Sequence, residues 1–369
     1  MTLSSLPQTT PASVPLDQAD QVDQAPSADQ RLVMLTDWIA TLSEFALQLD
    51  SLRPASADAS FRRYFRINDV AGISYILMDA PPPSEDVRPF IQVAELLQET
   101  GVTVPQIYAS HPEHGFLLLS DLGQVMYSHL LNQDTAHQLY MDAIASLIQI
   151  QGHHQPETLA DKAIPEYDRA MLLQELKLFP EWYIGKHLGA TLTEAQQLSL
   201  DKVFEQILAN TLAQPQVLVH RDYHSRNLMV MKEGNPGILD FQGAVLGPIT
   251  YDLVSLLRDA YIEWDEEQVL DWAIRYWEQA RKLGLPINSD IDSFYRDFEF
   301  MGLQRHLKIL GIFSRLSYRD GKSAYLNDLP LVVSYVRKTA QRYNTLIPLL
   351  RILDEIESGG VAPKIGYTF

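Results

Sequence analysis

The stretch Val217–Leu253, VLVHRDYHSRNLMVMKEGNPGILDFQGAVLGPITYDL, decides the fold of this chain. Residues 220–222 read His-Arg-Asp, Asn227 follows Asp222 by five residues, and Asp240 stands at the end of an apolar run. A carboxylate, an amide and a second carboxylate in this order are typical of a phosphoryl-transfer site. The first acid polarises the hydroxyl of the acceptor, while the amide and the second acid hold magnesium on the phosphates of ATP.

The spacing of these residues has a structural explanation. Residues 217–219 and 228–230 are short apolar runs that predict strands, and residues 233–237 (EGNPG) predict a turn. The chain therefore returns as a hairpin that places Asp240 beside Asn227. Each feature alone has an ordinary alternative, because His-Arg-Asp occurs by chance and Asp240 could be a turn residue. Their combination on one strand, loop and hairpin indicates a kinase-like site.

Composition and charge exclude several classes of protein. With 46% hydrophobic and 21% charged residues, the 369-residue chain is typical of a soluble globular protein with one two-lobed unit or two domains. A net charge of -18 argues against sequence-independent binding of nucleic acid. It does not argue against ATP, whose phosphates need only local positive charge.

The residue types that are missing are also informative. The sequence has no cysteine, which excludes disulfides and cysteine metal sites. It contains no apolar run of about 20 residues, the length that spans a bilayer. The N-terminus has no secretory signal pattern. We therefore expect a cytoplasmic protein with no membrane contact.

The N-terminal third predicts a tail, a helix and a small sheet. Residues 1–29 are rich in Ser, Thr, Pro, Gln, Ala and Asp without periodicity, which predicts disorder. Apolar side chains recur on one helical face from Leu32 to Leu49. A second helix is expected near residues 85–100. Strands are expected at residues 61–67, 74–79 and 116–119.

The stretch Ser56–Ile67 occupies the place of a phosphate-covering loop. Such a loop usually contains glycine, which allows close backbone approach, but this stretch has none. Ser60 and arginines would then bind the phosphates; alternatively, the stretch is an edge strand with a charged outer face. No lysine precedes Lys162, so an arginine must supply any cation here, with Glu95 as a possible partner. The best placed arginines are Arg62, Arg63 and Arg66.

The segment Ser120-Asp121-Leu122-Gly123 ends the third predicted strand. In two-lobed kinases the chain crosses between the lobes at such a place, and its backbone groups bind the adenine edge. The alternative is the polar turn that ends any buried strand.

Helices are expected through the rest of the chain. Thr250 would cap one of them, with Asp252 in its first turn, where an acid is favoured. That structural role is enough to explain Asp252. Gln304-Arg305-His306 forms a polar cluster, for which a solvated face is favoured over a ligand contact. Apolar periodicity predicts helices over residues 133–151, 166–183, 193–212, 266–283, 291–313 and 331–356.

These motifs resemble the aminoglycoside phosphotransferase and choline kinase superfamily. The shared features are His220–Asp222 with Asn227, Leu239–Phe241 and Thr250–Leu253. Longer strings are similar to the bacterial N-acetylmuramate/N-acetylglucosamine kinases, which are anomeric sugar kinases. These strings are ASADASFRRYFRI, YILMDAPPP, LLLSDLG, LFPEWYIGKHLG, VHRDYHSRNLM, LDFQGAVLGPITYDLVSLLRDAY and GLQRHLKILGIFSRLSYRDGK.

The resemblance covers the chain from about Leu32 onward and implies an α+β, two-lobed protein-kinase-like fold. Residues 1–29 would be a disordered tail, and residues 30–120 a small β-rich N-lobe with the nucleotide-binding sheet. Residues 121–369 would form a large, mostly helical C-lobe with the catalytic loop and the sugar site. Met78 stands where the wider superfamily has a basic residue.

The resemblance also implies roles for individual residues. Asp222 would be the catalytic base toward the sugar hydroxyl, Asn227 and Asp240 would hold Mg²⁺, and Asp252 would brace the catalytic loop. The nucleotide-binding residues would be Ser60, Phe61, Arg62, Arg63, Ser120, Asp121 and Leu122. The sugar would contact Tyr223, His224 and Arg226 of the catalytic loop, with Glu175, Trp182, Asp259 and Arg305 as further contacts. Either Arg226 or Arg305 would bind the carboxylate of N-acetylmuramate.

The implied activity is ATP- and Mg²⁺-dependent phosphorylation of the C1 hydroxyl of N-acetylmuramate and N-acetylglucosamine in peptidoglycan recycling. A downstream uridylyltransferase would use the sugar 1-phosphate to make UDP-N-acetylmuramate. Two alternatives stay open. The acidic composition suits a kinase for a cationic acceptor such as an aminoglycoside or choline. The missing lysine and glycine-rich loop suit a regulatory pseudokinase, whereas the intact Asp222, Asn227 and Asp240 count against one.

Overall fold

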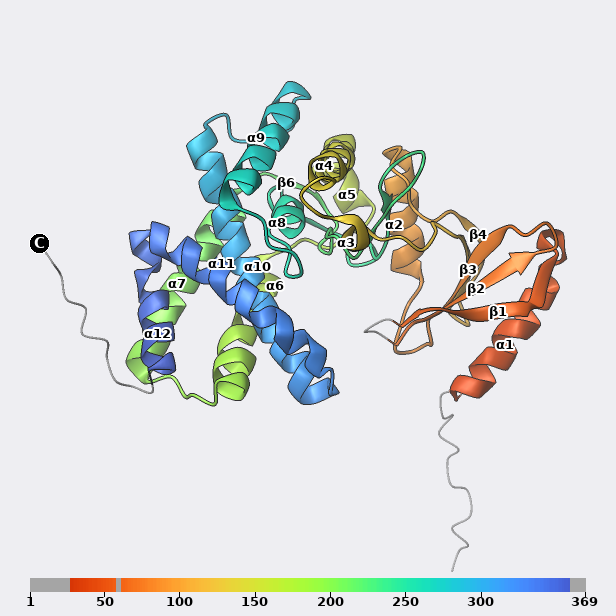
Figure 1. The fold of residues 1–369 in the computed structure, drawn as a ribbon, viewed down its shortest axis with the longest axis horizontal. Helices are drawn as coiled ribbons and strands as arrows, with labels where there is room; N and C mark the ends of the chain where they lie inside the picture. Colours follow the sequence, from red (N-terminus) through yellow and green to blue (C-terminus); the bar gives the residue numbers. More distant parts are fainter. Residues whose placement is uncertain (1–26, 58–60, 359–369) are drawn as a thin grey trace, which may run out of the picture.

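The N-terminal part of the molecule is an antiparallel sheet with a helix on each face (Figure 1). The computed structural model describes residues 27–57 and 61–358. Ser60, a predicted phosphate contact, and residues 1–26 of the predicted tail therefore lie outside the described residues. In spatial order the strands are β1 (Leu47–Ala57), β2 (Arg63–Asp69), β3 (Ser74–Asp79), β5 (Phe116–Ser120) and β4 (Ile107–His111). The strands predicted near residues 61–67, 74–79 and 116–119 are confirmed.

Alternating side chains of the sheet pack into two hydrophobic cores. Leu77 and Leu118 pack with α1 (Ala28–Thr41) on one face. Met78 and Leu117 pack on the other face with α2 (Arg88–Glu99), whose apolar side joins the main core. This alternation follows from the two-residue period of a strand. Met78 is 1% exposed, so the position that is basic in the wider superfamily is part of the core here.

The predicted first helix is too long at its C-terminal end. Helix α1 ends at Thr41, a short 3-10 turn follows at Ser43–Phe45, and Ala46 has a positive φ of 48°. Strand β1 then begins at Leu47. Of the later positions on the predicted face, Leu42 packs against the same core as α1, but Ala46 lies in the turn and Leu49 is 45% exposed.

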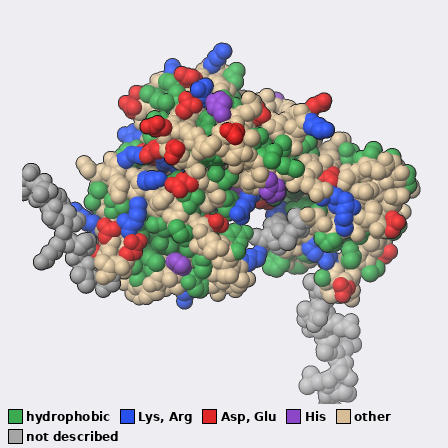
Figure 2. Space-filling view, viewed as in Figure 1, with side chains coloured by type: hydrophobic (Ala, Val, Ile, Leu, Met, Phe, Trp, Pro, Cys, Tyr) green, Lys and Arg blue, Asp and Glu red, His purple; other side chains and the backbone are tan. Residues whose placement is uncertain are grey.

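The C-terminal part is a helical lobe arranged around one long helix, α10 (Ile291–Asp320), as Figure 1 shows. Figure 2 shows a hollow between this lobe and the sheet. None of the helices among the described residues is long and apolar enough to cross a membrane. The other helical segments are α3 (Tyr127–Leu130), α4 (Ala136–His153), α5 (Pro156–Asp161), α6 (Arg169–Leu178), the π-helix η2 (Phe179–His187), α7 (Glu194–Ala213), α8 (Tyr251–Leu257), α9 (Glu266–Lys282), η3 (Ser323–Asp328), α11 (Leu329–Arg342), η4 (Asn344–Leu346) and α12 (Ile347–Glu357).

Three predicted helices differ from the structure. The helix predicted to end at residue 313 continues as α10 to Asp320. The helix predicted over residues 331–356 is two helices, because the chain turns at η4 and α12 starts afresh with a proline in its first turn. The helix predicted over residues 166–183 changes to the π-helix η2 at Phe179, directly before Pro180. A proline cannot donate the backbone hydrogen bond that would continue an α-helix.

Two small antiparallel sheets hold the stretch Val217–Leu253. Strand β6 (Gln216–Val219) pairs with β9 (Val245–Pro248), and β7 (Leu228–Met229) pairs with β8 (Gly237–Ile238). The predicted strand, loop and hairpin are therefore confirmed. Thr250 occupies the predicted N-cap position of α8, with Asp252 in the first turn, but its hydroxyl donates to Gln214 Oε1 at 2.6 Å and makes no capping bond.

Candidate active site

Buried hydrogen bonds fix the loop between β6 and β7. Asp252 accepts the backbone N–H groups of His220, at 2.6 Å, and of Arg221, at 3.0 Å. The predicted brace is therefore observed. The His220 ring lies 3.0 Å from the carbonyl oxygen of Leu239 through Nε2, and its Nδ1 accepts the N–H of Asp222 at 3.2 Å. Burial lowers the pKa of His220 to about 4, so the ring stays neutral and can accept that bond.

The loop and the hairpin bring Asn227 and Asp240 together, as the spacing predicts. Asn227 Nδ2 donates to the carbonyl oxygen of Asp222 at 2.9 Å and to Asp240 Oδ2 at 3.4 Å. Arg221 and Asp240 both have positive φ angles, of 75° and 62°. Such angles in residues other than glycine cost about 1–3 kcal/mol each and are typical of functional sites.

The same pair of residues fits a magnesium ion. Because Asn227 uses its amide nitrogen for these bonds, its amide oxygen is the atom left to act as a ligand. Together with the carboxylate of Asp240 it gives the hard oxygen donors that Mg²⁺ prefers. Asp240 is about one-third exposed, so an ion can reach it from the hollow between the lobes. Asn227 and Asp240 would hold the ion.

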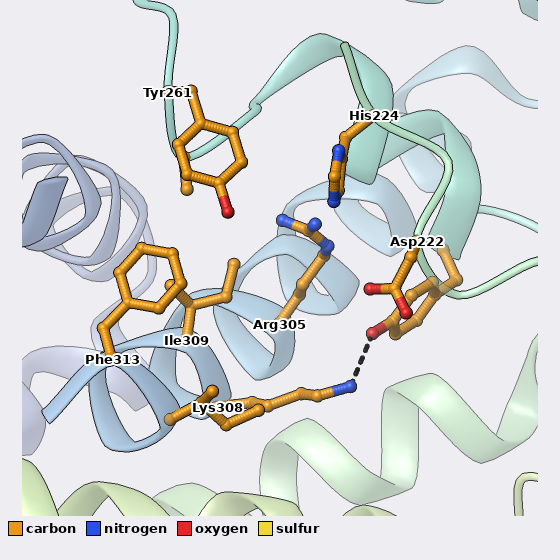
Figure 3. Close-up of a pocket in the computed structure, with 10 residues that line it drawn as sticks. Asp222, His224, Tyr261, Arg305, Lys308, Ile309 and Phe313 are labelled. Carbon is orange, nitrogen blue, oxygen red and sulfur yellow. Dashed lines mark hydrogen bonds between the residues drawn. The ribbon is translucent and has the colours of Figure 1, made fainter. Parts of the chain in front are cut away.

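Asp222 lines a partly open pocket of about 100 Å³ (Figure 3). Burial raises the pKa of Asp222, but Lys308 and other positive groups outweigh it, so the pKa lies below its ordinary value. Asp222 is therefore ionised at neutral pH. The residues that line the pocket are Asp222, His224, Tyr251, Ala260, Tyr261, Arg305, Lys308, Ile309, Ile312 and Phe313.

Two cations from α10 lie in this pocket. Lys308 Nζ donates to Tyr251 OH at 3.1 Å and is 3.0 Å from Glu175 Oε1. Arg305 is 4% exposed, and its Nη1 has no hydrogen-bond partner. In Figure 3 its guanidinium group points between Tyr261 and Asp222. A buried donor without a hydrogen-bond partner is costly, so Arg305 is suited to bind an anionic or polar group of a ligand through Nη1.

Comparisons with known proteins show the family of this chain. The sequence pattern of the phosphotransferase enzyme family matches residues 51–283. The chain belongs to this phosphotransferase family. It is 44% identical over 345 residues to the N-acetylmuramate/N-acetylglucosamine kinase of Pseudomonas putida, covering 91% of this chain and 100% of that protein. It is 45% identical to the protein of the same name from Neisseria meningitidis, covering 92% and 100% of the two chains.

Solved structures support the two-lobed protein-kinase-like fold of this phosphotransferase. The GDP complex of aminoglycoside 2'-phosphotransferase-IIIa superposes with a TM-score of 0.59 at 17% identity, covering 85% of this chain and 99% of that one. A choline kinase from Streptococcus pneumoniae gives a TM-score of 0.57 at 12% identity, covering 84% and 100%. The predicted α+β fold, with a β-rich N-lobe and a helical C-lobe, is confirmed.

The predicted nucleotide-binding arginines of the phosphotransferase have different partners. Arg62 Nη2 lies 3.3 Å from Asp240 Oδ1, on the far side of the hollow, and Arg62 Nε lies 3.9 Å from Glu85. Arg63 is bound instead to the buried Asp79, at 2.9 Å through Nε. Glu95 is exposed on α2, so the suggested partner of these arginines is wrong and Glu85 takes that place for Arg62.

The predicted hinge residues are partly engaged by the N-lobe. Arg66 of β2 binds both carboxylate oxygens of Asp121, at 2.6 and 2.9 Å. The Asp121 side chain is therefore bound to the sheet. The Ser120 hydroxyl accepts the N–H of Gln106 at 2.9 Å. Leu122 packs toward Gly237 of β8. Phe61 is 71% exposed. The backbone groups of the hinge thus remain the predicted adenine contacts.

The structure divides the predicted sugar contacts into two groups. His224 and Arg305 line the pocket. Arg226 lies at its rim, with its guanidinium carbon 3.4 Å from the centre of the Tyr261 ring. Exposure of the Gln304–His306 cluster was a wrong expectation, because α10 runs through the middle of the lobe and all three residues are buried.

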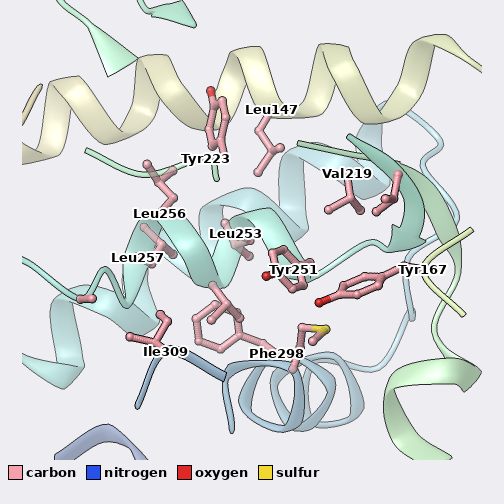
Figure 4. Packing of buried hydrophobic residues seen from close by; sticks show 14 of the residues in the cluster. Leu147, Tyr167, Val219, Tyr223, Tyr251, Leu253, Leu256, Leu257, Phe298 and Ile309 are labelled. Carbon is pink, nitrogen blue, oxygen red and sulfur yellow. The ribbon is translucent and has the colours of Figure 1, made fainter. Parts of the chain in front are cut away.

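Four predicted sugar contacts face elsewhere. Tyr223 is fully buried beside Leu147, where its hydroxyl donates to the carbonyl oxygen of Ala143 at 2.8 Å (Figure 4). Asp259 is buried and accepts the N–H and hydroxyl of Ser225, at 3.1 and 2.5 Å. Glu175 binds Arg221 beneath the loop. Trp182 is half-buried in η2, outside the pocket lining. The first three are therefore supports rather than sugar contacts.

Lys308, Tyr261 and Phe313 line the pocket but were not predicted. One signal was available for Lys308, because residues three apart share a helix face and Arg305 was already a predicted contact. Tyr261 and Phe313 come from different parts of the chain, and their ring centres lie 6.1 Å apart. Their spacing in the sequence does not predict this contact.

Proposed function

We propose that this phosphotransferase transfers the γ-phosphoryl group of ATP to the anomeric C1 hydroxyl of N-acetylmuramate and N-acetylglucosamine. The near full-length similarity to two kinases named for these sugars supports the substrate class. One observation carries the proposal for this chain: Asp222 opens onto a pocket that also holds the unpartnered Nη1 of Arg305. A hydroxyl beside Asp222 and a carboxylate beside Arg305 are the two groups that N-acetylmuramate offers.

The proposed reaction needs little covalent chemistry from the protein. The C1 oxygen forms a bond to the γ-phosphorus, the bond from that phosphorus to the β–γ bridging oxygen breaks, and ADP leaves. The hydroxyl proton passes to the Asp222 carboxylate. Since the pKa of Asp222 is low, it orients the hydroxyl first and takes the proton as transfer proceeds. Mg²⁺ on Asn227 and Asp240 would neutralise charge on the phosphates.

The charge of the pocket supports an amino sugar over a cationic acceptor. Arg305 and Lys308 both lie in it, and Lys308 is held in its charged form because Tyr251 and Glu175 outweigh the effect of burial on its pKa. A cationic acceptor such as choline or an aminoglycoside would meet two like charges beside Asp222. The regulatory pseudokinase is disfavoured because Asn227 and Asp240 are brought together as a metal site requires.

We place the reaction in peptidoglycan recycling in the cytoplasm, where a uridylyltransferase would use the sugar 1-phosphate toward UDP-N-acetylmuramate. The test is incubation of the protein with MgATP and each sugar, followed by phosphorus NMR. The expected product is a sugar 1-phosphate, recognised by coupling of phosphorus to the anomeric proton. ADP formation with choline or an aminoglycoside, and none with either sugar, would overturn the proposal.

A further inference from the structure

Among the described residues, three arginines of the N-lobe bind nearby carboxylates, whereas Arg62 reaches the C-lobe. No lysine precedes Lys162 in the sequence. Arg31 and Arg63 both bind the fully buried Asp79. Arg66 binds Asp121 with two nitrogens. These arginines hold the sheet together and are not directed at the hollow between the lobes.

Arg62 is the exception among the N-lobe arginines whose partners the structure describes. Its Nη2 reaches the C-lobe and lies 3.3 Å from Asp240 Oδ1, while its Nε is 3.9 Å from Glu85. The side chain is 10% exposed, and the residue directly precedes β2. An ion pair thus links the two lobes at the residue that would hold magnesium.

This ion pair and a metal ion compete for the same carboxylate. Asp240 Oδ1 accepts from Gln242 Nε2 at 2.8 Å and is faced by Arg62, while Oδ2 is 3.4 Å from Asn227 Nδ2. Magnesium takes its oxygen ligands at about 2.0–2.1 Å and demands near-ideal geometry. A divalent ion on this carboxylate repels the guanidinium group and takes over the charge that Arg62 neutralises.

We propose that Arg62 exchanges partners during nucleotide binding. It pairs with Asp240 while the nucleotide site is empty, and it donates to the phosphates when Asp240 takes Mg²⁺. This inference rests on the proposed use of MgATP. Arg62 then supplies the cation that is absent at the buried Met78, from the neighbouring strand β2 rather than from β3.

The exchange keeps every charge paired in both states. Without the metal, Arg62 neutralises the carboxylate of Asp240, whose side chain is only about one-third exposed. With MgATP bound, the planar guanidinium fork matches two phosphate oxygens, as ammonium groups do not. Arg62, which links the two lobes in the free protein, thereby binds the ligand instead.

The test measures metal binding and nucleotide binding separately, because the exchange predicts opposite changes. Mn²⁺ binding to the nucleotide-free protein is followed by electron paramagnetic resonance, and MgATP binding by calorimetry. In Arg62→Ala we expect Mn²⁺ to bind several-fold more tightly, since its competitor is gone. We expect MgATP to bind about tenfold more weakly, the scale of one charged hydrogen bond. Arg88→Ala is the matched control, because Arg88 is 79% exposed and pairs with Asp86.

Each outcome has one interpretation. Weaker binding of both Mn²⁺ and MgATP, or no change in either, overturns the exchange. If Arg62→Ala does not fold, Arg62→Lys takes its place, with the same signs and smaller changes expected. If the wild-type protein binds no MgATP, the proposed function itself is refuted. If the wild-type protein and Arg62→Ala bind MgATP equally well, only this inference is refuted.

Discussion

Replacing Arg305 by methionine tests how the pocket recognises its acceptor. Methionine keeps a long, flexible side chain in a position that is 4% exposed, but it removes the charge. We expect the variant to lose much of its activity on N-acetylmuramate, which carries a carboxylate, and far less on N-acetylglucosamine, which lacks one. The physical reason is the unpartnered Arg305 Nη1 in the pocket.

The expected size follows from one charged hydrogen bond. Such a bond contributes about 1.5–3 kcal/mol, which is a factor of about 10–150 in kcat/KM. Arg305 also lowers the pKa of Asp222, although less than Lys308 does, and its removal therefore affects both sugars. The ratio of the two kcat/KM values cancels that shared effect and isolates recognition of the carboxylate.

The assay is ADP release with each sugar, and Arg226→Met is the matched control. Arg226 was the alternative carboxylate ligand, but it is exposed and lies on the Tyr261 ring. An unchanged ratio in Arg305→Met would refute the assignment. A changed ratio in Arg226→Met alone would transfer the role to the rim of the pocket.

Three further predictions concern the catalytic loop. Asp222→Asn should lower kcat by about 10²–10⁴-fold with an unchanged melting temperature, measured by ADP release and thermal unfolding. Lys308→Met should raise the pKa of Asp222, because the strongest opposing cation is lost, so the acid limb of the kcat/KM profile should move to higher pH. His220 has a folded pKa of about 4 against an ordinary 6.5, so the unfolded chain binds more protons between these values. The free energy of unfolding should therefore fall, by up to about 3 kcal/mol, as pH drops from 6.5 through 4; urea titrations that give His220→Asn the same pH slope as the wild type would contradict this.

The catalytic stretch could be predicted because its geometry is local. Asp222, Asn227 and Asp240 are held by a loop and a hairpin whose strands and turn are visible as apolar runs and as EGNPG. Strand and turn patterns extend over only a few residues, so the sequence alone predicts that Asn227 and Asp240 lie side by side. The same holds for the strands of the N-lobe.

The acceptor pocket could not be predicted, because α10 brings its residues from far along the chain. Arg305 and Lys308 lie on a helix that is packed on all sides, where polar residues would normally mark the solvated face. Tyr223 shows the opposite error. It follows Asp222 directly in the sequence, yet its ring enters the core under α4, so adjacency to a catalytic residue did not imply a place in the site.

The buried acids beneath the loop explain how such a site tolerates strain. Arg221 keeps a φ of 75°, and Glu175 holds its guanidinium group through Oε1. The same oxygen lies 3.0 Å from Lys308 Nζ, the strongest positive influence on Asp222. One carboxylate therefore fixes both the backbone that presents the base and the cation that keeps it ionised. Glu175 thus supports the site through Arg221 and Lys308 and does not occupy the place of the predicted sugar contact.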